Sequence, residues 1–333
     1  MNGSTNRSLR FLSVMLRRRS AVLAVLIGLI SALVGIVDPG FLSTGVWTDI
    51  LIRSSPAAIV ACGLMLTMVT GEIDISMGSL MALLAAAFGL MVSRHHGDLS
   101  IWLGIPLTLF IGTLIGLMTG LMVTVGTVPS IVVTLGLLTA FRGLTSIVMD
   151  GRNIDGLPEN LLQLTRTGIA GIPACLWAAA TVILLTFVII HHTALGRRLF
   201  AAGSSPSSAL IAGLPVRRLK IFTFAWTGFL TALATVFDVP RLPKIEAGIG
   251  MEFELLVVTC VVVGGVSVAG GKGQLSGVLL AVVLMTMVRP VLTFLDIGES
   301  GERWTRAIQG SFILLAVVCD SLLQRKHLHK GCS

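Results

Sequence analysis

Stretches of about twenty apolar residues recur along the whole chain, and they restrict its fold more than any other feature. An α-helix needs about 20 mostly apolar residues to cross the hydrocarbon core of a bilayer. The 333-residue chain is 54% hydrophobic and only 12% charged, so it has too little polar surface for a soluble domain. The sequence therefore predicts an all-α, polytopic membrane protein with about ten transmembrane helices, at 20–37, 50–69, 79–93, 101–125, 129–149, 172–190, 221–239, 253–269, 275–295 and 304–322.

Basic residues lie in dense groups beside these segments and predict how the helices are oriented. Five arginines precede the first segment, five basic residues lie in 191–220 and three follow residue 322, so that with Lys272 one side holds 14 of the 24. Cytoplasmic loops of membrane proteins carry such an excess. We therefore expect both termini in the cytoplasm, with a basic amino tail at 1–19, one transmembrane domain at 20–322 that includes the cytoplasmic loop 191–220, and a carboxyl tail at 323–333.

The amino end has the basic start and apolar run of a secretory signal peptide, with the run at 21–37. A cleaved signal peptide ends in a small-residue cleavage site. Here the run ends in Asp38 and Pro39, and many further spans follow. We therefore expect an uncleaved first helix.

A polar stretch at 70–79, Thr-Gly-Glu-Ile-Asp-Ile-Ser-Met-Gly-Ser, separates two apolar runs. An ionised acid at the centre of a bilayer costs about 2.5–3.5 kcal/mol. Glu72 and Asp74 are therefore expected to face a protein interior, a water-filled path or a membrane surface. The stretch is predicted to be a charged break between two helices, which makes a transport path the first function to test. Asp74 has a second interpretation, as an acceptor for backbone N–H groups at a helix start.

Glycines are spaced four residues apart in the segment 101–125. Residues at this spacing lie on one helix face, and small residues there let another helix approach closely. The alternative is plain glycine richness, since the chain has 37 glycines. We favour a close helix contact at Gly112, Gly116 and Gly120.

The loop 191–220 is the longest connection on the predicted cytoplasmic side. A short helix is expected at 204–212, with serines able to cap its start and Gly213 and Pro215 able to end it. Basic pairs flank this helix on both sides. Two readings stay open: a helix that docks in the groove of a cytoplasmic partner, and a basic anchor for the topology without a partner.

Four blocks of the chain, in order, resemble ribose-type (monosaccharide) ABC transporter permeases, which are subunits of the bacterial inner membrane. The residues that carry the resemblance are GEIDISMGS at 71–79, VPSIVVTLGLLTAFRGL at 128–144, the stretch 195–234, and 251–285. The resemblance implies an importer built from two permeases (two copies of this chain, or this chain and a similar one), two cytoplasmic ATPases and a soluble sugar-binding protein. It also implies that 203–213 is a coupling helix that receives the motion of the ATPase.

From this resemblance we expect hydroxyl side chains to meet a sugar along a central path. The candidate path residues are Glu72, Asp74, Ser76, Ser79, Thr134 and Thr139. The candidate residues for coupling to the ATPase are Gly203, Ala209, Ala212, Gly213 and Arg217. Two departures from the family pattern bear on the choice of substrate: Glu72 stands where the family often has glycine, and residues 255–259 replace an acid followed by small residues.

Several other patterns are set aside. Gly-Gly-Lys-Gly-Gln at 270–274 lacks the glycine spacing and the Ser or Thr of a phosphate loop. The chain is therefore predicted not to be an enzyme, and ATP is expected to be hydrolysed by a partner. No cofactor or metal site is expected, and His191 and His192 are read as an interfacial cap. Glu252 and Glu254 are placed near an outer helix end, in solvent or against a binding protein.

Two other functions compete with the importer. One is a secondary carrier coupled to protons through Glu72 or Asp74. The other is an intramembrane enzyme, which would need convergent acids, a metal site or a nucleophile with its base. No such set stands out in the sequence, so the carrier is the stronger alternative.

Overall fold

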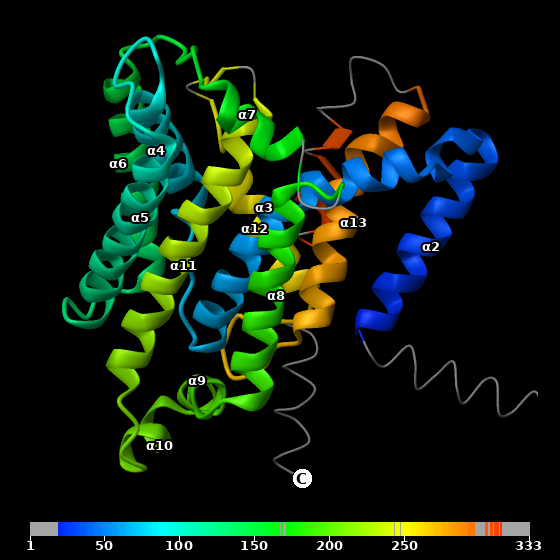
Figure 1. Cartoon of the computed structure of the whole chain (residues 1–333). Coiled ribbons are helices and arrows are strands. Elements are labelled where there is room, and N and C mark those ends of the chain that lie inside the picture. The colour runs from blue at the N-terminus through cyan, green and yellow to red at the C-terminus, as the bar shows by residue number, and fades with distance from the viewer. Residues whose placement is uncertain are drawn as a thin grey trace, which may run out of the picture.

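Helices that stand side by side form the described part of the chain, residues 19–166, 168, 171–242, 244–246, 248–296, 304–305, 307–308, 310–312 and 314 of the computed structural model (Figure 1). Those residues contain no strand, only one isolated bridge between Ile154 and Ile245, and the all-α class is confirmed for them. The helices are α2 (Arg19–Val37), α3 (Thr44–Val69), α4 (Met77–Val92), α5 (Ile101–Thr124), α6 (Ser130–Met149), α7 (Glu159–Arg166), α8 (Ala174–His192), α9 (Ala194–Ser204), α10 (Pro206–Ile211), α11 (Val216–Asp238), α12 (Phe253–Val263) and α13 (Leu275–Phe294), with the 3-10 turns η1 (Pro39–Leu42) and η2 (Val239–Arg241).

Seven of these helices are long and apolar enough to cross a membrane: α2, α3, α5, α6, α8, α11 and α13. Each one matches a predicted segment, so the chain is a multi-pass membrane protein. The predicted segments 79–93 and 253–269 form the shorter helices α4 and α12, with 16 and 11 residues. At 1.5 Å per residue α12 covers about 17 Å, roughly half of the hydrocarbon core. The predicted segment 304–322 and both tails lie mostly outside the described residues.

One predicted boundary is wrong. The segment 253–269 ends as a helix at Val263, because Gly264 and Gly265 follow and Gly265 has φ +97°, a conformation that a helix cannot continue. The short helix predicted at 204–212 is present as α10, and the loop 191–220 also holds α9, a helix that was not predicted. Thr193 caps α9 by accepting from Gly196 N at 3.2 Å, and Ser205 caps α10 by accepting from Ser208 N at 3.4 Å.

Helix α3 lies at the centre of the bundle. Every residue from Ser54 to Val69 is buried, and α3 packs against α8, α11, α12 and α13. Thr67 on α3 and Thr227 on α11 share a hydrogen bond of 3.0 Å between their hydroxyls. In contrast α2, α5, α6 and α8 expose large apolar side chains, such as Leu29, Phe110 and Leu184. An apolar surface of this kind is suited to contact with lipid. Polar groups of a transport path are therefore expected in the interior of the bundle, near α3.

Three of the four glycines of α5, Gly112, Gly116 and Gly120, lie against α11. A Cβ at Gly116 would lie 2.4 Å from the Phe224 carbonyl oxygen, and one at Gly120 would lie 2.9 Å from Ile221 Cα. At Gly112 it would lie 2.7 Å from the carbonyl oxygen of Gly228, a glycine of α11. The two backbones therefore touch, which fixes how α11 stands beside α5.

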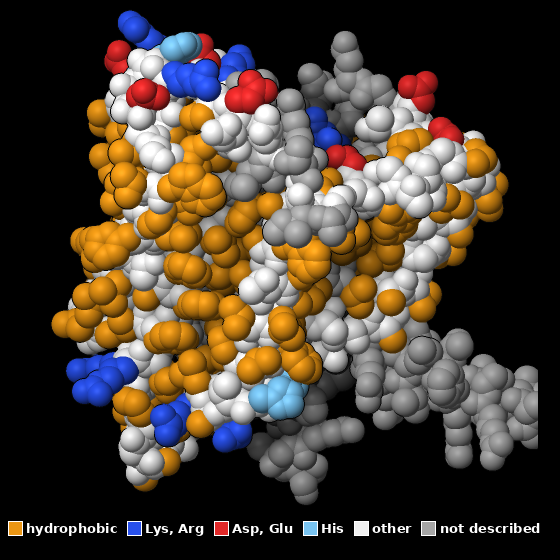
Figure 2. All heavy atoms as spheres, viewed as in Figure 1, with side chains coloured by type: hydrophobic (Ala, Val, Ile, Leu, Met, Phe, Trp, Pro, Cys, Tyr) orange, Lys and Arg blue, Asp and Glu red, His pale blue; other side chains and the backbone are white. Residues whose placement is uncertain are grey.

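The two ends of the bundle differ in charge. We call them the α10 end and the α7 end, after the helices found there (Figure 1). On the face shown in Figure 2, the acidic side chains gather towards the α7 end, where Lys, Arg and His side chains accompany them, whereas the α10 end shows Lys, Arg and His side chains without acidic ones. This difference separates the two membrane surfaces of the protein.

Candidate functional site

The break between α3 and α4 is an extended segment held by α6. It begins at Gly71, whose φ of +82° suits glycine, and α4 begins at Met77. Ile73 in its middle donates its N–H to Ser130 Oγ at 3.2 Å, and Thr134 Oγ1 donates to the Ile73 carbonyl at 3.5 Å. The predicted break is therefore present, and its backbone is fixed by side chains of the neighbouring helix.

Asp74 sits at the start of α4 and is only 4% exposed. Its Oδ1 accepts hydrogen bonds from Ser76 N at 2.9 Å and from Ser76 Oγ at 2.7 Å. Ser79 Oγ donates to the Ser76 carbonyl at 2.8 Å. An acid is favourable at a helix N-terminus because the backbone N–H groups there carry partial positive charge. This geometry supports the structural interpretation of Asp74.

We expect Asp74→Ala to lower the stability of the protein by about 1 kcal/mol or more, since a hydrogen bond to a charged group contributes about 1.5–3 kcal/mol. Asp74→Asn keeps an oxygen that can accept the hydrogen bonds from Ser76, so this variant should lose less stability. The measurement is the melting temperature of the purified protein together with its abundance in membranes. Normal abundance and melting of the Ala variant, combined with lost transport, would instead assign Asp74 to the path.

Thr139 does not join the other predicted path residues. It is exposed on α6, and its Oγ1 donates to the Leu135 carbonyl of the same helix at 3.2 Å. Five residues along a helix correspond to a rotation of roughly 140° from Thr134. Thr134 therefore faces the break, whereas Thr139 faces away from it.

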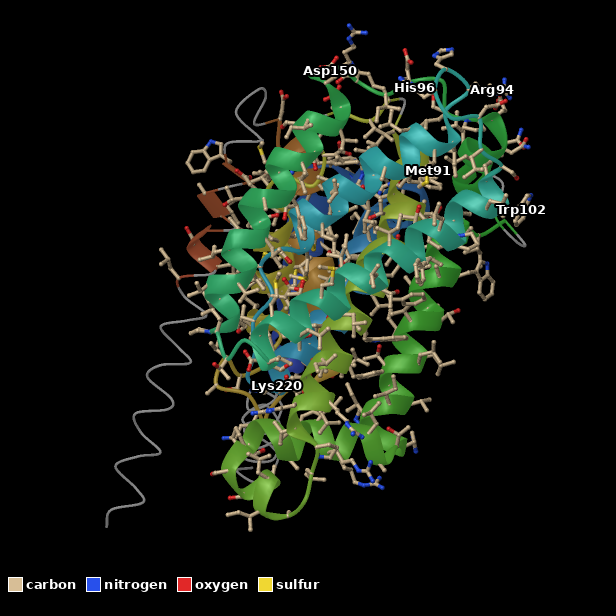
Figure 3. The ribbon with its side chains drawn as sticks, turned by 90° about the vertical axis from the view of Figure 1, so that its left-hand side faces the viewer. Met91, Arg94, His96, Trp102, Asp150 and Lys220 are labelled. Carbon is tan, nitrogen blue, oxygen red and sulfur yellow. The ribbon has the colours of Figure 1, made fainter. Side chains whose placement is uncertain are left out.

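Glu72 lies at the α10 end and is paired with Lys220, the fifth residue of α11, where Lys220 Nζ donates to Glu72 Oε1. The two side chains are 13% and 20% exposed, respectively. Figure 3 places Lys220 at the end opposite to Arg94 and Asp150. The two acids of the break thus have separate surroundings: Asp74 is bound to Ser76, and Glu72 is bound to α11.

The structure adds a charged pair that sequence reasoning missed, Arg142 on α6 and Glu254 on α12. Their closest atoms, Arg142 Nη2 and Glu254 Oε2, lie 3.6 Å apart. Arg142 also donates to the carbonyls of Ile249 at 2.8 Å and Gly250 at 2.5 Å. Glu254 is 8% exposed, so its predicted place in solvent or against a binding protein is wrong. A lone arginine inside an apolar segment was the signal available for this pair.

The pair stands where the N-termini of the short helices α4 and α12 meet. A Cβ at Gly78, the second residue of α4, would lie 1.7 Å from Glu254 Oε2 and 2.8 Å from the Gly250 carbonyl oxygen. Only glycine leaves room for the carboxylate here. In membrane transporters, interrupted helices commonly aim their N-termini at the solute site. In the sequence, the two short apolar segments were the signal for such a site. In the structure, the N-termini of the two helices that they form lie together.

Helices α9 and α10 cover the α10 end. Gly203 lies against the end of α3, because a Cβ there would be 1.7 Å from the Val69 carbonyl oxygen. Ala209, one of the candidate coupling residues, is buried. Ala212, Gly213 and Arg217 are exposed. Beside them Ile211 is 90% exposed, which is unusual for isoleucine at a polar end.

At the α7 end, the loops 93–100 and 150–158 are joined. Arg94 N donates to the Gly156 carbonyl at 3.1 Å, and Ser93 Oγ donates to the Asp155 carbonyl at 2.7 Å. His95 Nδ1 and Asp155 Oδ1 lie 3.0 Å apart, and this hydrogen bond holds the pKa of the Asp155 carboxyl below its usual range. A cavity of about 420 Å³ beside these loops is lined by Arg94, Asp98, Leu99, Ser100, Ile101, Trp102, Ile105, Pro158, Asn160 and Leu161.

Comparison with known proteins gives one family for most of the chain. Residues 46–317 match the family described as branched-chain amino acid transport system / permease component. The chain is 35% identical to the ribose import permease protein RbsC of Haemophilus influenzae over 301 residues, 89% of this chain and 91% of the relative. It is 32% identical to RbsC of Bacillus subtilis over 86% of this chain and 88% of the relative.

A relative with a different named solute is also similar. The autoinducer 2 import system permease protein LsrC of Yersinia pseudotuberculosis is 31% identical over 308 residues, 92% of this chain and 86% of the relative. No solved structure matches the chain.

Proposed function

The chain belongs to the family of branched-chain amino acid transport system permease components, and from that membership we propose that it is the transmembrane subunit of an ATP-driven importer for a monosaccharide or a sugar-like solute. The named solutes of its relatives, ribose and autoinducer 2, define the class of cargo. The chain itself carries no chemistry in this scheme. It provides the path, and a cytoplasmic ATPase provides the energy.

The α10 end faces the cytoplasm in this proposal. Its support is the group of Arg and Lys side chains there, which have no acidic side chains beside them on the face shown in Figure 2, since the cytoplasmic loops of membrane proteins are enriched in basic residues. Both termini then lie in the cytoplasm of a bacterium, with the protein in the plasma (inner) membrane. The α7 end faces outward, where the joined loops 93–100 and 150–158 offer a surface for a soluble sugar-binding protein. A second permease, either another copy or a similar chain, completes the importer.

The single observation that carries the role in coupling is the arrangement of α9 and α10. The exposed apolar surface of α10 is available to a partner, while Gly203 at the end of α9 touches the backbone of α3. Helix α3 is the buried centre of the bundle and leads directly into the break at 70–76. A force applied by an ATPase at α10 therefore reaches the break through packed backbone.

Reconstitution tests this function. The permease, its ATPase and its binding protein are placed in liposomes, and uptake of labelled ribose and autoinducer 2 is measured with ATP inside. We expect uptake that requires ATP and stops with an inactive ATPase. Uptake that persists without ATP and follows an imposed proton gradient would support the secondary carrier instead. The import permeases among the relatives favour the ATP-driven importer over that carrier.

Exposed Ile211 gives the sharpest test of the coupling surface. We expect Ile211→Asp to reduce the amount of ATPase that copurifies with the permease by roughly tenfold, since an apolar interface anchor contributes about 1–2 kcal/mol or more. The matched control is Asn153→Asp, which adds the same charge at an exposed position of the α7 end and should leave copurification unchanged. Full copurification of Ile211→Asp would support the reading of this region as a basic anchor only.

A further inference from the structure

The ion pair between Glu72 and Lys220 joins two parts of the chain that lie 148 residues apart. Glu72 is the third residue of the break at 70–76 that follows α3. Lys220 is the fifth residue of α11, which begins five residues after the end of α10. The pair therefore connects the segment beside the transport path directly to the helix that follows the proposed ATPase contact.

The surroundings of the pair distinguish it from an ordinary surface ion pair. Both side chains are mostly shielded from solvent, and removal of one partner from such a pair leaves a charge without compensation. A cavity of about 370 Å³ beside the pair brings together the turn between α5 and α6, α10 and α11. Its lining includes Glu72, Thr124, Pro129, Leu210, Arg217 and Lys220. Arg217 is the other charged group that faces this space.

The break is tethered on both sides of Glu72. Before it, Val69 O accepts a hydrogen bond of 2.9 Å from Gly271 N, and Gly71 has the positive φ of a tight turn. After it, Ile73 is bound to Ser130 and Thr134 on α6. Glu72 adds a link to α11. When α11 moves relative to α6, the ion pair must either carry the break with it or open.

We propose that the Glu72–Lys220 ion pair is a coupling latch, which ties movement of α10 and α11 to the conformation of the break and so makes ATP hydrolysis productive. The inference rests on the proposed function. It concerns a residue that departs from the resembled signature, since Glu72 stands where that signature often has glycine. The role is one of positioning: the pair lies at the α10 end and acts on the path through the backbone of 70–76.

Reversal of charge tests the latch in the complete complex with ATPase and binding protein. The variants are Glu72→Lys, Lys220→Glu and the double exchange. We expect each single variant to keep ATP hydrolysis and ATPase copurification while solute uptake per ATP falls by roughly fivefold or more, the usual lower range of coupling between sites. The double exchange restores the pair and should recover most of the uptake per ATP.

The melting temperature gives a second readout that needs no transport. Each single variant should melt lower, and the double exchange should recover part of the loss, as expected for two interacting residues. Recovery of melting without recovery of uptake per ATP would overturn the latch and leave a structural brace. Unchanged uptake per ATP in both single variants would also overturn it.

A control separates the latch from the function on which it rests. Lys244 and Glu246 form an exposed pair of 3.2 Å at the α7 end, and Glu246→Gln should change neither readout. Failure of the unmodified complex to import any solute with ATP would contradict the proposed function itself. Normal import by the unmodified complex and by both single variants would contradict only the latch.

Discussion

Replacement of Arg142 by Met is expected to destabilise the protein by about 3–5 kcal/mol, the cost of removing one partner from a buried ion pair. The change leaves Glu254 without its counter-charge at the meeting point of α4 and α12. It also removes the donors to the carbonyls of Ile249 and Gly250, which end the loop that leads into α12. Each buried polar group left without a partner adds to the loss. The measurement is the melting temperature in detergent and the abundance in membranes.

Companion variants test whether the unpaired charge of Glu254 causes the loss of stability in Arg142→Met. The double change Arg142→Met with Glu254→Gln removes both charges, so it should melt higher than Arg142→Met alone. Arg142→Lys keeps the charge but cannot reproduce the fork of guanidinium donors, so its melting temperature should lie between that of Arg142→Met and that of the double variant. Arg53→Met is the control, because the Arg53–Asp49 pair of 2.6 Å is half-exposed and such pairs contribute about 0–1 kcal/mol. Equal melting of Arg142→Met and Arg53→Met would contradict the structural importance of the buried pair.

Gly203→Ala is expected to have the largest effect at the α10 end, although it adds a single methyl group. The methyl would lie 1.7 Å from the Val69 carbonyl oxygen and 2.8 Å from Gly271 N. These two atoms form the hydrogen bond that holds the end of α3, so the methyl must separate α9 from α3. Overpacking costs about 1–3 kcal/mol, and a backbone neighbour that cannot rotate away places this change at the upper end.

The readouts for Gly203→Ala are the melting temperature and the uptake per ATP of the complete importer, and both should fall. The control is Gly45→Ala near the start of α3, where a Cβ would meet nothing within 4 Å and alanine is the better helix former. That variant should melt at the same temperature or slightly higher. Normal melting and transport of Gly203→Ala would show that the contact between α9 and α3 is looser than described.

Hydropathy was sufficient to predict the long helices, because a segment that crosses lipid must be apolar along its whole length. The break at 70–76 was predictable for the same reason, since Glu72 and Asp74 interrupt an apolar run. Hydropathy does not show which residue each polar group meets. The partners of the break lie far along the chain, at Ser130, Thr134 and Lys220.

Glu254 shows the limit of sequence reasoning most clearly. It was placed in solvent because it stands at the start of an apolar segment, where a spanning helix meets the membrane surface. Helix α12 is too short to span, so its N-terminus lies inside the protein against Gly78. Thr139 failed for another reason: a hydroxyl on the correct helix was chosen without regard to its face. Both errors concern the position of a residue in space, which one-dimensional periodicity does not determine.

The central position of α3 has a consequence for the order of synthesis. The helices that enclose it, α8, α11, α12 and α13, all follow it in the chain. The 146 residues between Val69, the end of α3, and Val216, the start of α11, take about 7–30 s to translate. During that interval, only α8 of the four helices that enclose α3 has been made. A ribosome that stalls before α11 therefore leaves a nascent chain whose central helix lacks three of its four neighbours, and membrane proteases and chaperones would meet the protein in that state.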